Sequence, residues 1–398
     1  MSRFERHAGR TLAIVLIVGL VAVLAATEAV LRAVEDPSAA RPGIGTVTPA
    51  RYLEFREWQP GMRFRAAPPQ IRRDNPGGRV LDVYAIDTDD DGFIMPSRVH
   101  EEPDLTIVFV GGSTTESMYV APEERFPYLV GRILERRLGL KVNSLNGARS
   151  GDNAMHVNAI VLGKVLPLHP DYAVFMTDIN DLAVLSRFGT YWNSNSDSAL
   201  VRRERTGVEW GFRLIRDALI PATYRAYRTA LLSARGLFGR KPVAGAVARA
   251  PANAEHAQWE QWGSAYASAV QEFVDTSRAW RVRPVLMTEL LLPPGGWRQP
   301  GDAAGGDYLA AEKLERRGFS SSSFSDAHEY FNGILRQTAR QSNVGLIDLM
   351  ASGPWTNNEV YDGLHFTDAG SERAASIIAD ALEAMIKADR AAAGAPNP

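Results

Sequence analysis

From about residue 104 the sequence alternates short apolar segments with segments of helical periodicity, and this alternation constrains the fold more than any other feature. The first apolar segment is a continuous β-branched run, as expected for a strand covered on both faces. Strands that alternate with helices predict a parallel sheet with helices on both sides, here a three-layer α/β/α sandwich. The expected strands are 106–110, 142–145, 172–176, 284–292 and 345–350. The expected helices are 126–138, 153–165, 259–280, 324–341 and 368–391.

The N-terminal region has the pattern of a membrane anchor. Three arginines within residues 1–10 precede an uncharged apolar stretch from Thr11 to Thr27, which is at the short end for a spanning helix. Because the arginines precede the stretch, we expect a cytoplasmic end at 1–10 and a transmembrane signal anchor at 11–33. The remaining chain would then lie in the periplasm or outside the cell. A signal peptide cleaved near Ala25–Thr27 is the alternative, and it exports the chain as well.

Three other regions fall outside the alternating pattern. Residues 34–100 are rich in proline, arginine and glycine toward their start and lack a clear period, which predicts a stalk and an irregular extension. Residues 186–258 read as a helical insertion within a domain spanning 101–390, and 391–398 as a flexible tail. The apolar and basic residues of 210–238 indicate a membrane-surface or gating element, or an ordinary helical insertion with solvated arginines.

The composition excludes several classes of function. The 398 residues include no cysteine, which excludes disulfides, thiolate catalysis and zinc–thiolate sites. A net charge of −2 gives no general attraction to nucleic acid, and we expect no nucleic-acid partner. The run Asp87–Gly92 is similar to the start of a calcium-binding loop. The twelfth position of that loop should be a glutamate and is Arg98 here, so we expect no metal site.

The first expected strand runs into the turn Gly111-Gly112-Ser113. The turn matches neither a dinucleotide fingerprint nor a P-loop. It lies at the carboxyl edge of the expected sheet, where ligands bind in folds of this class, and its glycines leave room for a substrate. Taken alone, Ser113 is more typical of a helix N-cap. A nucleophilic serine needs a base, and the base needs an orienting partner.

His365 is the histidine best placed to act as that base. It lies in the loop Tyr361–Gly370, between the last expected strand and the last helix. Asp362 precedes it by three residues, a spacing that lets a carboxylate reach the imidazole and fix its tautomer. His156, in a probable helix close to a strand end, is a second candidate.

Two further loops supply polar groups at the same edge of the sheet. The loop Asn146–Asp152 follows the second expected strand, and Asp178–Asp181 follows the third. The backbone N–H of Gly151, the amide of Asn180 and the N–H of Ser113 can together stabilise a developing oxyanion.

In order, the four loops resemble the SGNH or GDSL-type hydrolases, a family named for Ser, Gly, Asn and His in four sequence blocks. The blocks here are Val-Gly-Gly-Ser-Thr-Thr, Ser-Gly-Asp-Asn, Asp-Ile-Asn-Asp and Asp-Gly-Leu-His. The resemblance covers roughly residues 104–185 and 284–388 and implies a flavodoxin-like sandwich with a five-stranded parallel sheet. The residues it assigns as nucleophile, base, orienting carboxylate and oxyanion donors are Ser113, His365, Asp362, Gly151 and Asn180.

The blocks depart from the family pattern at two positions. Gly112 stands where the family name has Asp, and the resulting Gly-Gly-Ser-Thr-Thr resembles a variant of membrane-linked bacterial members. Asp178 stands where a glycine usually precedes the x-Asn-Asp of the third block. Together with Glu116 and Asp152 it predicts an acidic pocket that favours neutral, hydroxyl-rich substrates. The residues expected to contact substrate are Gly112, Thr114, Glu116, Asp152 and Asp178.

The sequence therefore predicts a membrane-anchored, extracytoplasmic serine esterase that acts on a carbohydrate or lipid ester through an acyl-enzyme, without a metal or an organic cofactor. One alternative is an O-acyltransferase acting on a cell-surface polysaccharide, with the insertion at 186–258 excluding water. The other is a non-catalytic glycan-binding envelope protein, against which the intact serine, asparagine, aspartate and histidine argue. The oligomeric state stays open.

Overall fold

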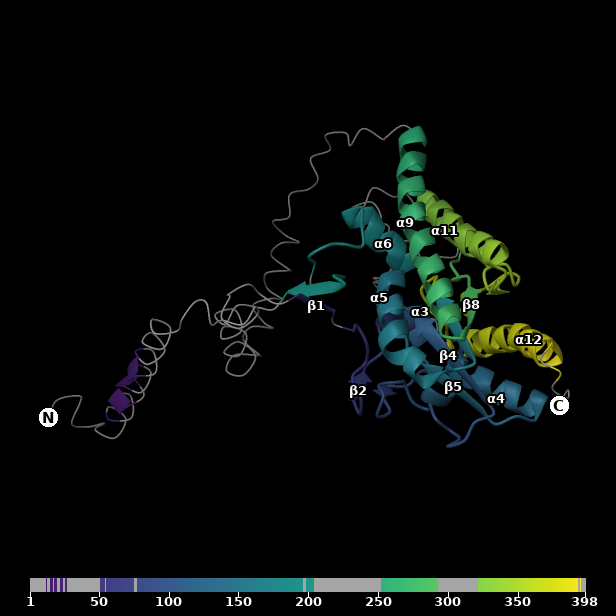
Figure 1. Cartoon of the computed structure of the whole chain (residues 1–398), viewed down its shortest axis with the longest axis horizontal. Helices are drawn as coiled ribbons and strands as arrows, with labels where there is room; N and C mark the ends of the chain where they lie inside the picture. The colour runs from purple at the N-terminus through teal and green to yellow at the C-terminus, as the bar shows by residue number, and fades with distance from the viewer. Residues whose placement is uncertain are drawn as a thin grey trace. The chain divides into compact units, whose positions relative to one another are not determined.

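The computed structural model describes scattered positions between Leu12 and Ala26 and the ranges 51–53, 55–74, 77–195, 198–203, 252–292, 321–392 and 394 (Figure 1). The chain divides into two compact units, one of Met1–Arg51 with Arg203–Pro221 and one of Tyr52–Arg202 with Ala222–Pro398. In the first unit, the described positions from Leu12 to Ala26 are helical and exposed. All further elements of the fold that position the site belong to the second unit.

Most of the N-terminal anchor predicted at 11–33 lies outside the described residues. Among the residues that are described, no helix is both long enough and apolar enough to cross a membrane. The segment 210–238 also lies outside them, as does most of the predicted insertion at 186–258. The described part of that insertion includes the end of helix α6 (Ile179–Phe188) and strand β7 (Val201–Arg203), which pairs with β1 (Arg51–Leu53) in a two-stranded sheet.

A five-stranded sheet forms the centre of the second unit, with strand order β5-β4-β6-β8-β9. Every neighbouring pair is parallel. In sequence order, the first of the five strands thus lies between the second and the third, which is the doubly wound, flavodoxin-like order. The predicted parallel sheet is confirmed. The strands are β4 (Leu105–Gly111), β5 (Val142–Asn146), β6 (Tyr172–Met176), β8 (Arg283–Met287) and β9 (Gly345–Ile347).

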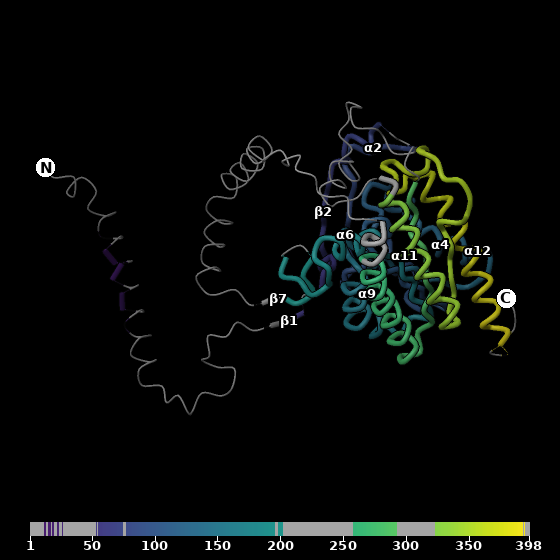
Figure 2. The backbone as a smooth tube through the Cα atoms, turned by 90° about the horizontal axis from the view of Figure 1, so that it is seen from above, coloured from purple at the N-terminus to yellow at the C-terminus, as the bar shows by residue number. Residues whose placement is uncertain are grey.

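The alternating side chains of β4 explain why helices cover both faces of the sheet. Ile107 and Phe109 belong to one buried cluster and Val108 and Val110 to the other, because successive side chains of a strand point to opposite faces. Helices α4 (Phe126–Leu138) and α12 (Asp368–Ala392) cover the first face. Helices α5 (Ala154–Ile160), α9 (Ala252–Ala279) and α11 (Ser321–Ser342) cover the second. Figure 2 shows α4 beside α12 and α9 beside α11.

Two predicted strands and one helix are shorter than expected. The strand predicted at 284–292 ends at Met287, because the N–H of Glu289 bonds to the side chain of Asn332 instead of a neighbouring strand. The strand predicted at 345–350 ends at Ile347. The helix predicted at 153–165 is α-helical to Ile160 and then continues through a wider π turn (Val161–Val165) and a 3₁₀ turn (Leu166–Leu168).

Residues 55–74 and 77–100, which belong to the region predicted as a stalk and an irregular extension, pack onto the domain. Strands β2 (Arg63–Ala66) and β3 (Tyr84–Asp87) form an antiparallel pair, preceded and connected by turns and by α2 (Gln70–Asp74). The N–H of Ile94 bonds to the carbonyl of Asn146 at the end of β5. The segment lacks a long period because its buried apolar side chains come singly or in short groups. They are Trp58, Ile71, Tyr84, Ile86, Phe93 and Ile94.

Candidate active site

The turn that follows β4 lies at the carboxyl edge of the sheet, beside the point where the strand order reverses. Helix α3 (Ser113–Glu116) begins directly after this turn, with Gly112 as its N-cap. A side chain at Gly112 would collide with its surroundings, since a Cβ built there lies 2.4 Å from Nδ2 of Asn180. The missing side chain therefore makes room for the Asn180 amide next to Ser113. This close approach is a physical reason for a glycine at this position.

Ser113, His365 and Asp362 form one continuous chain of hydrogen bonds. Nε2 of His365 lies 2.8 Å from Oγ of Ser113, and Nδ1 of His365 lies 2.7 Å from Oδ2 of Asp362. Asp362 also accepts the N–H groups of Leu364 and His365 at Oδ1. A carboxylate can only accept, so these partners assign the proton to Nδ1 and leave Nε2 free to accept from the serine. The structure thus brings together the three residues that the sequence singled out.

The charges around His365 favour its protonated form. Burial by itself lowers the pKa of His365, but the adjacent carboxylate of Asp362, with smaller contributions from Glu289 and Glu116, raises it above its ordinary value. On the other side, the ring of Tyr361 stacks on the imidazole with 5.6 Å between centroids and 17° between planes. The guanidinium of Arg72 lies 5.8 Å from the centre of that tyrosine ring.

A cavity of about 300 Å³ opens beside the serine. Ser113, Asp362 and His365 all line it. Most of its remaining wall is apolar or aromatic, and part of this wall comes from the N-terminal segment that the sequence assigned to a stalk. These wall residues are Pro69, Ile71, Met118, Tyr119, Tyr361 and Phe366.

Gly151 and Asn180, the two oxyanion donors predicted besides Ser113, are outside the set of residues that line the cavity. Asn180 is in the first turn of α6, and its Nδ2 donates to the carbonyl of Asp152 at 2.9 Å. Gly151 has φ +84, in the left-handed region that favours glycine, and its neighbour Ser150 does line the cavity. Their role as oxyanion donors stays a prediction.

Glu116 links the nucleophile helix to two other segments. Its carboxylate accepts from Nε1 of Trp58 at 2.8 Å and from the N–H of Ser150 at 3.1 Å, and it also accepts from the Ser150 hydroxyl. Burial raises the pKa of Glu116, although these hydrogen bonds act in the opposite direction. Glu116 and Thr114 line the cavity, and their contact with substrate stays a prediction.

The other two acidic candidates point into the protein. Asp152 is fully buried against Arg56, whose Nε lies 2.9 Å from Oδ1. Asp178 is fully buried with Oδ2 3.5 Å from Nε2 of His328. Burial raises the pKa of both aspartates well above the ordinary value and lowers that of His328 to about 3. The expected acidic pocket is therefore corrected, since of the three carboxylates only Glu116 lines the cavity.

His156 is not placed to act as the base of Ser113. It is buried in the first turn of α5, where it forms a capping box with Asn153. Its Nδ1 accepts the N–H of Asn153 at 3.4 Å. Within the described ranges, no group of histidines and carboxylates is arranged to hold a metal ion.

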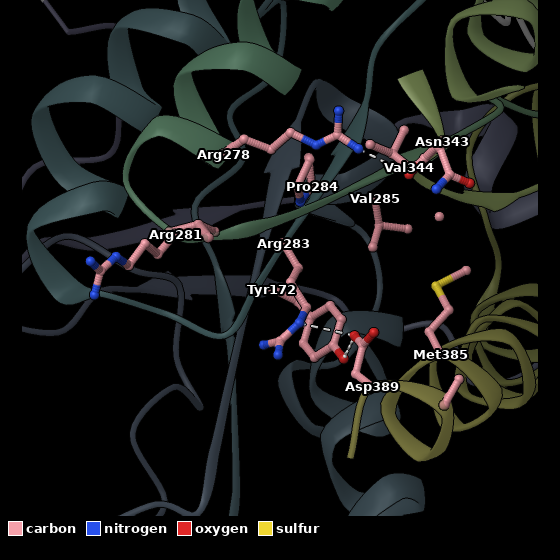
Figure 3. A pocket seen from close by; sticks show the side chains of 13 residues that line it. Tyr172, Arg278, Arg281, Arg283, Pro284, Val285, Asn343, Val344, Met385 and Asp389 are labelled. Carbon is pink, nitrogen blue, oxygen red and sulfur yellow. Dashed lines mark hydrogen bonds and ion pairs between the residues drawn. The ribbon is translucent and has the colours of Figure 1, made fainter. Parts of the chain in front are cut away.

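A larger cavity of about 540 Å³ opens at the opposite, amino-terminal edge of the sheet (Figure 3). Several of its charged groups pair with one another. Nε of Arg283 lies 3.0 Å from Oδ2 of Asp389, which also accepts from the Tyr172 hydroxyl, and Arg278 donates to backbone carbonyls. No serine or histidine is among the residues that line it. The smaller cavity at the carboxyl edge is therefore the candidate active site.

Sequence reasoning missed Glu289, whose carboxylate lies beneath the nucleophile turn. The available signal was a single charged residue within the otherwise apolar run 284–292. A buried charge needs hydrogen-bonding partners and so indicates a structural or functional contact. The wall provided by Pro69 and Ile71 was also missed, because no local pattern links these residues to the serine.

Comparison with known proteins finds similarity in structure but not in sequence. No family model and no curated protein matches the chain. One similar solved structure is an acetylxylan esterase from Geobacillus stearothermophilus, with 14% identity over 70% of this chain and 92% of that chain and a TM-score of 0.37. A second is a lipase/acylhydrolase from Enterococcus faecalis, with 13% identity over 71% of this chain and 96% of that chain and a TM-score of 0.39. A third is a GDSL-like lipase from Bacteroides thetaiotaomicron, with 10% identity over 70% of this chain and 88% of that chain and a TM-score of 0.37.

The environment of His365 predicts an imidazole that stays protonated to a higher pH than a free histidine. We expect NMR titration of the ring protons to give a pKa above 6.5 for His365 in the wild-type protein. Asp362→Asn removes the negative charge that most strongly raises the pKa of His365. The pKa of His365 in this variant should therefore fall below the wild-type value. Asp348→Asn, at the end of β9, is the matched control and should leave the titration unchanged. An unchanged titration of His365 in Asp362→Asn would refute the assignment of Asp362 as the carboxylate that raises the pKa of His365.

Proposed function

We propose that the protein is a serine ester hydrolase of the SGNH type. The observation that carries this proposal is the hydrogen-bonded chain from Ser113 through His365 to Asp362, lining a cavity at the carboxyl edge of the sheet. A hydroxyl bonded to the free nitrogen of an imidazole, whose other nitrogen is held by a buried carboxylate, is the arrangement that activates serine for acyl transfer.

The reaction follows from the positions of these groups. Oγ of Ser113 attacks the ester carbonyl while Nε2 of His365 accepts its proton, and Asp362 stabilises the resulting imidazolium. The N–H groups of Ser113 and Gly151 and the amide of Asn180 are proposed to hold the oxyanion. His365 then protonates the leaving alcohol, which leaves an acyl-enzyme. Water attacks this intermediate with His365 again as base, releasing the acid and restoring the serine.

The size and lining of the cavity support a short acyl group. Its volume of about 300 Å³ is at the lower end of the range for small-molecule sites. The wall is apolar on the sides formed by Ile71, Met118 and Phe366, which suits the hydrocarbon part of an acyl chain. We propose a carbohydrate or a lipid as the alcohol part of the ester. The alcohol part can be larger than the cavity, because it needs only to reach the open side.

Replacement of the nucleophile tests this proposal directly. We expect the wild-type protein to hydrolyse p-nitrophenyl acetate and butyrate and Ser113→Ala to lose at least about 10⁴-fold in kcat, since the acyl-enzyme cannot form. Ser268→Ala, on the exposed side of α9, is the matched serine control and should retain full activity. Wild-type activity in Ser113→Ala, or no turnover of either ester by the wild-type protein, would contradict the proposed function.

We also propose that residues 11–33 anchor the protein in a membrane, with the catalytic unit in the periplasm or outside the cell. The support is the order of basic and apolar residues at the N-terminus. Alkaline phosphatase fused to the C-terminus is active only after export, so the fusion should be active in bacterial cells. A stable but inactive fusion would contradict export.

A further inference from the structure

We propose that Glu289 is a positioning residue of this site, holding the nucleophile turn and the Asn180 helix together and keeping a negative charge near His365. The inference rests on the proposed function, since it concerns how the same serine and histidine are held. Glu289 follows the end of β8 by two residues, so this strand supplies it to the carboxyl edge of the sheet. It is 3% exposed.

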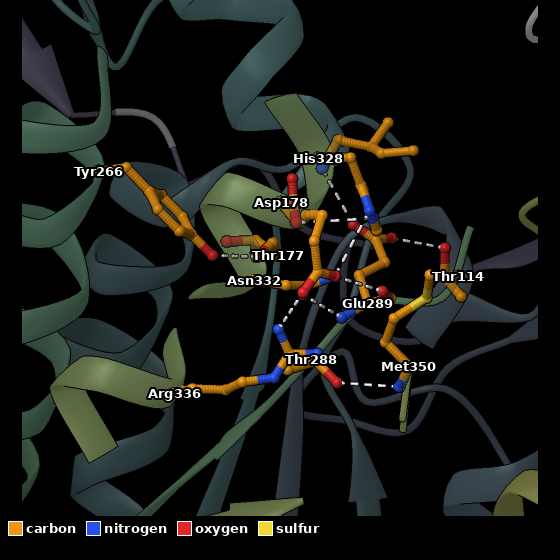
Figure 4. A network of polar contacts seen from close by, with 12 residues as sticks. Thr114, Thr177, Asp178, Tyr266, Thr288, Glu289, His328, Asn332, Arg336 and Met350 are labelled. Carbon is orange, nitrogen blue, oxygen red and sulfur yellow. Dashed lines mark hydrogen bonds and ion pairs between the residues drawn. The ribbon is translucent and has the colours of Figure 1, made fainter. Parts of the chain in front are cut away.

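The carboxylate of Glu289 joins two loops that are far apart in sequence (Figure 4). Oε1 accepts from the hydroxyl of Thr114 at 2.7 Å, and Oε2 accepts from the N–H of Ile179 at 3.0 Å. Thr114 directly follows the nucleophile Ser113, and Ile179 directly precedes Asn180. One side chain thus fixes the distance between the attacking serine and the amide proposed to stabilise the oxyanion.

The backbone of Glu289 is itself firmly held. The buried side chain of Asn332, on α11, accepts the N–H of Glu289 at 3.0 Å and donates to its carbonyl at 2.9 Å. Two hydrogen bonds from one amide fix the orientation of this peptide segment. The carboxylate is therefore presented from a rigid position, as the support of a catalytic group requires.

Glu289 also occupies the place of the missing cap of α6. The N-cap residue Asp178 makes no side-chain capping bond, and its carboxylate lies near His328 instead. Glu289 accepts the N–H of the first helical residue in its place. Burial raises the pKa of Glu289, and the hydrogen bonds from Thr114 and from the N–H of Ile179 act in the opposite direction, as expected for a negative charge at a helix N-terminus.

The charge of Glu289 acts on His365 as well. The charged and titratable groups that face the imidazole are Asp362 from its own loop, Glu116 from α3, Glu289 from the end of β8, Tyr361 in the stack, and Arg72 beyond that ring. Burial lowers the pKa of His365, and the three carboxylates together raise it. A neutral side chain at 289 would stabilise the imidazolium less.

Glu289→Gln removes the negative charge of the side chain and keeps its shape. We expect kcat for p-nitrophenyl acetate to fall about tenfold to a hundredfold, with a smaller change in KM, because the serine and the oxyanion donor lose their fixed spacing. The acid limb of the pH profile should move to lower pH by about one unit, since the base loses a nearby negative charge. A role in folding alone would lower the melting temperature without moving this limb.

Two further variants keep the test decisive. Asp348→Asn makes the same kind of change, from carboxylate to amide, directly after the neighbouring strand β9. The Asp348 carboxylate binds Arg336 and Thr288. This variant should leave the acid limb of the pH profile in place. Thr114→Val removes one partner of Glu289 but keeps its charge, so kcat should fall without a shift in the pH profile. If Glu289→Gln does not fold, Thr114→Val still tests whether Glu289 positions the nucleophile turn.

The outcomes distinguish this inference from the proposed function. Wild-type kcat and an unmoved acid limb in Glu289→Gln, in an active protein, would overturn the role of Glu289 alone. Absence of turnover in the wild-type protein would instead overturn the esterase proposal. Even then, NMR titration of His365 in Glu289→Gln tests the electrostatic part, and an unchanged titration would refute it.

Discussion

Buried carboxylates at the carboxyl edge of the sheet hold the active-site loops in place. A carboxylate removed from water is costly unless donors surround it, so each one fixes the segments that supply those donors. Asp362 binds the histidine and its own loop. Glu116 joins the nucleophile helix to Ser150 and Trp58. Glu289 joins the same helix to α6. The geometry around the serine depends on these three acids.

The N-terminal extension is part of the catalytic unit. Arg56 pairs with the buried Asp152, and Trp58 donates to Glu116. Ile71 lines the cavity, and Arg72 is fully buried between the Tyr361 ring and Asp368. The extension therefore satisfies charges that the sheet domain alone would leave buried and unpaired. It also forms one wall of the cavity beside Ser113.

Much of the sheet and the triad could be predicted because the relevant patterns are local. Strands buried on both faces appear as apolar runs, and Asp362 and His365 are three residues apart on one loop. The rest depends on contacts between distant segments. Glu289 binds residues 110 and 175 positions away, and no periodicity reveals such a pairing. The buried residues of the extension come singly or in short groups, and Asp178 lies against His328, which is distant in sequence.

The proposed function depends on Ser113 as a nucleophile activated by His365. The most direct measurement is to treat the protein with a fluorophosphonate ester and locate the adduct by mass spectrometry of peptides. We expect a single phosphonyl group on the peptide that contains Ser113, formed rapidly in the wild-type protein and far more slowly in His365→Ala. No adduct, an adduct on another serine, or equal labelling of both proteins would contradict it.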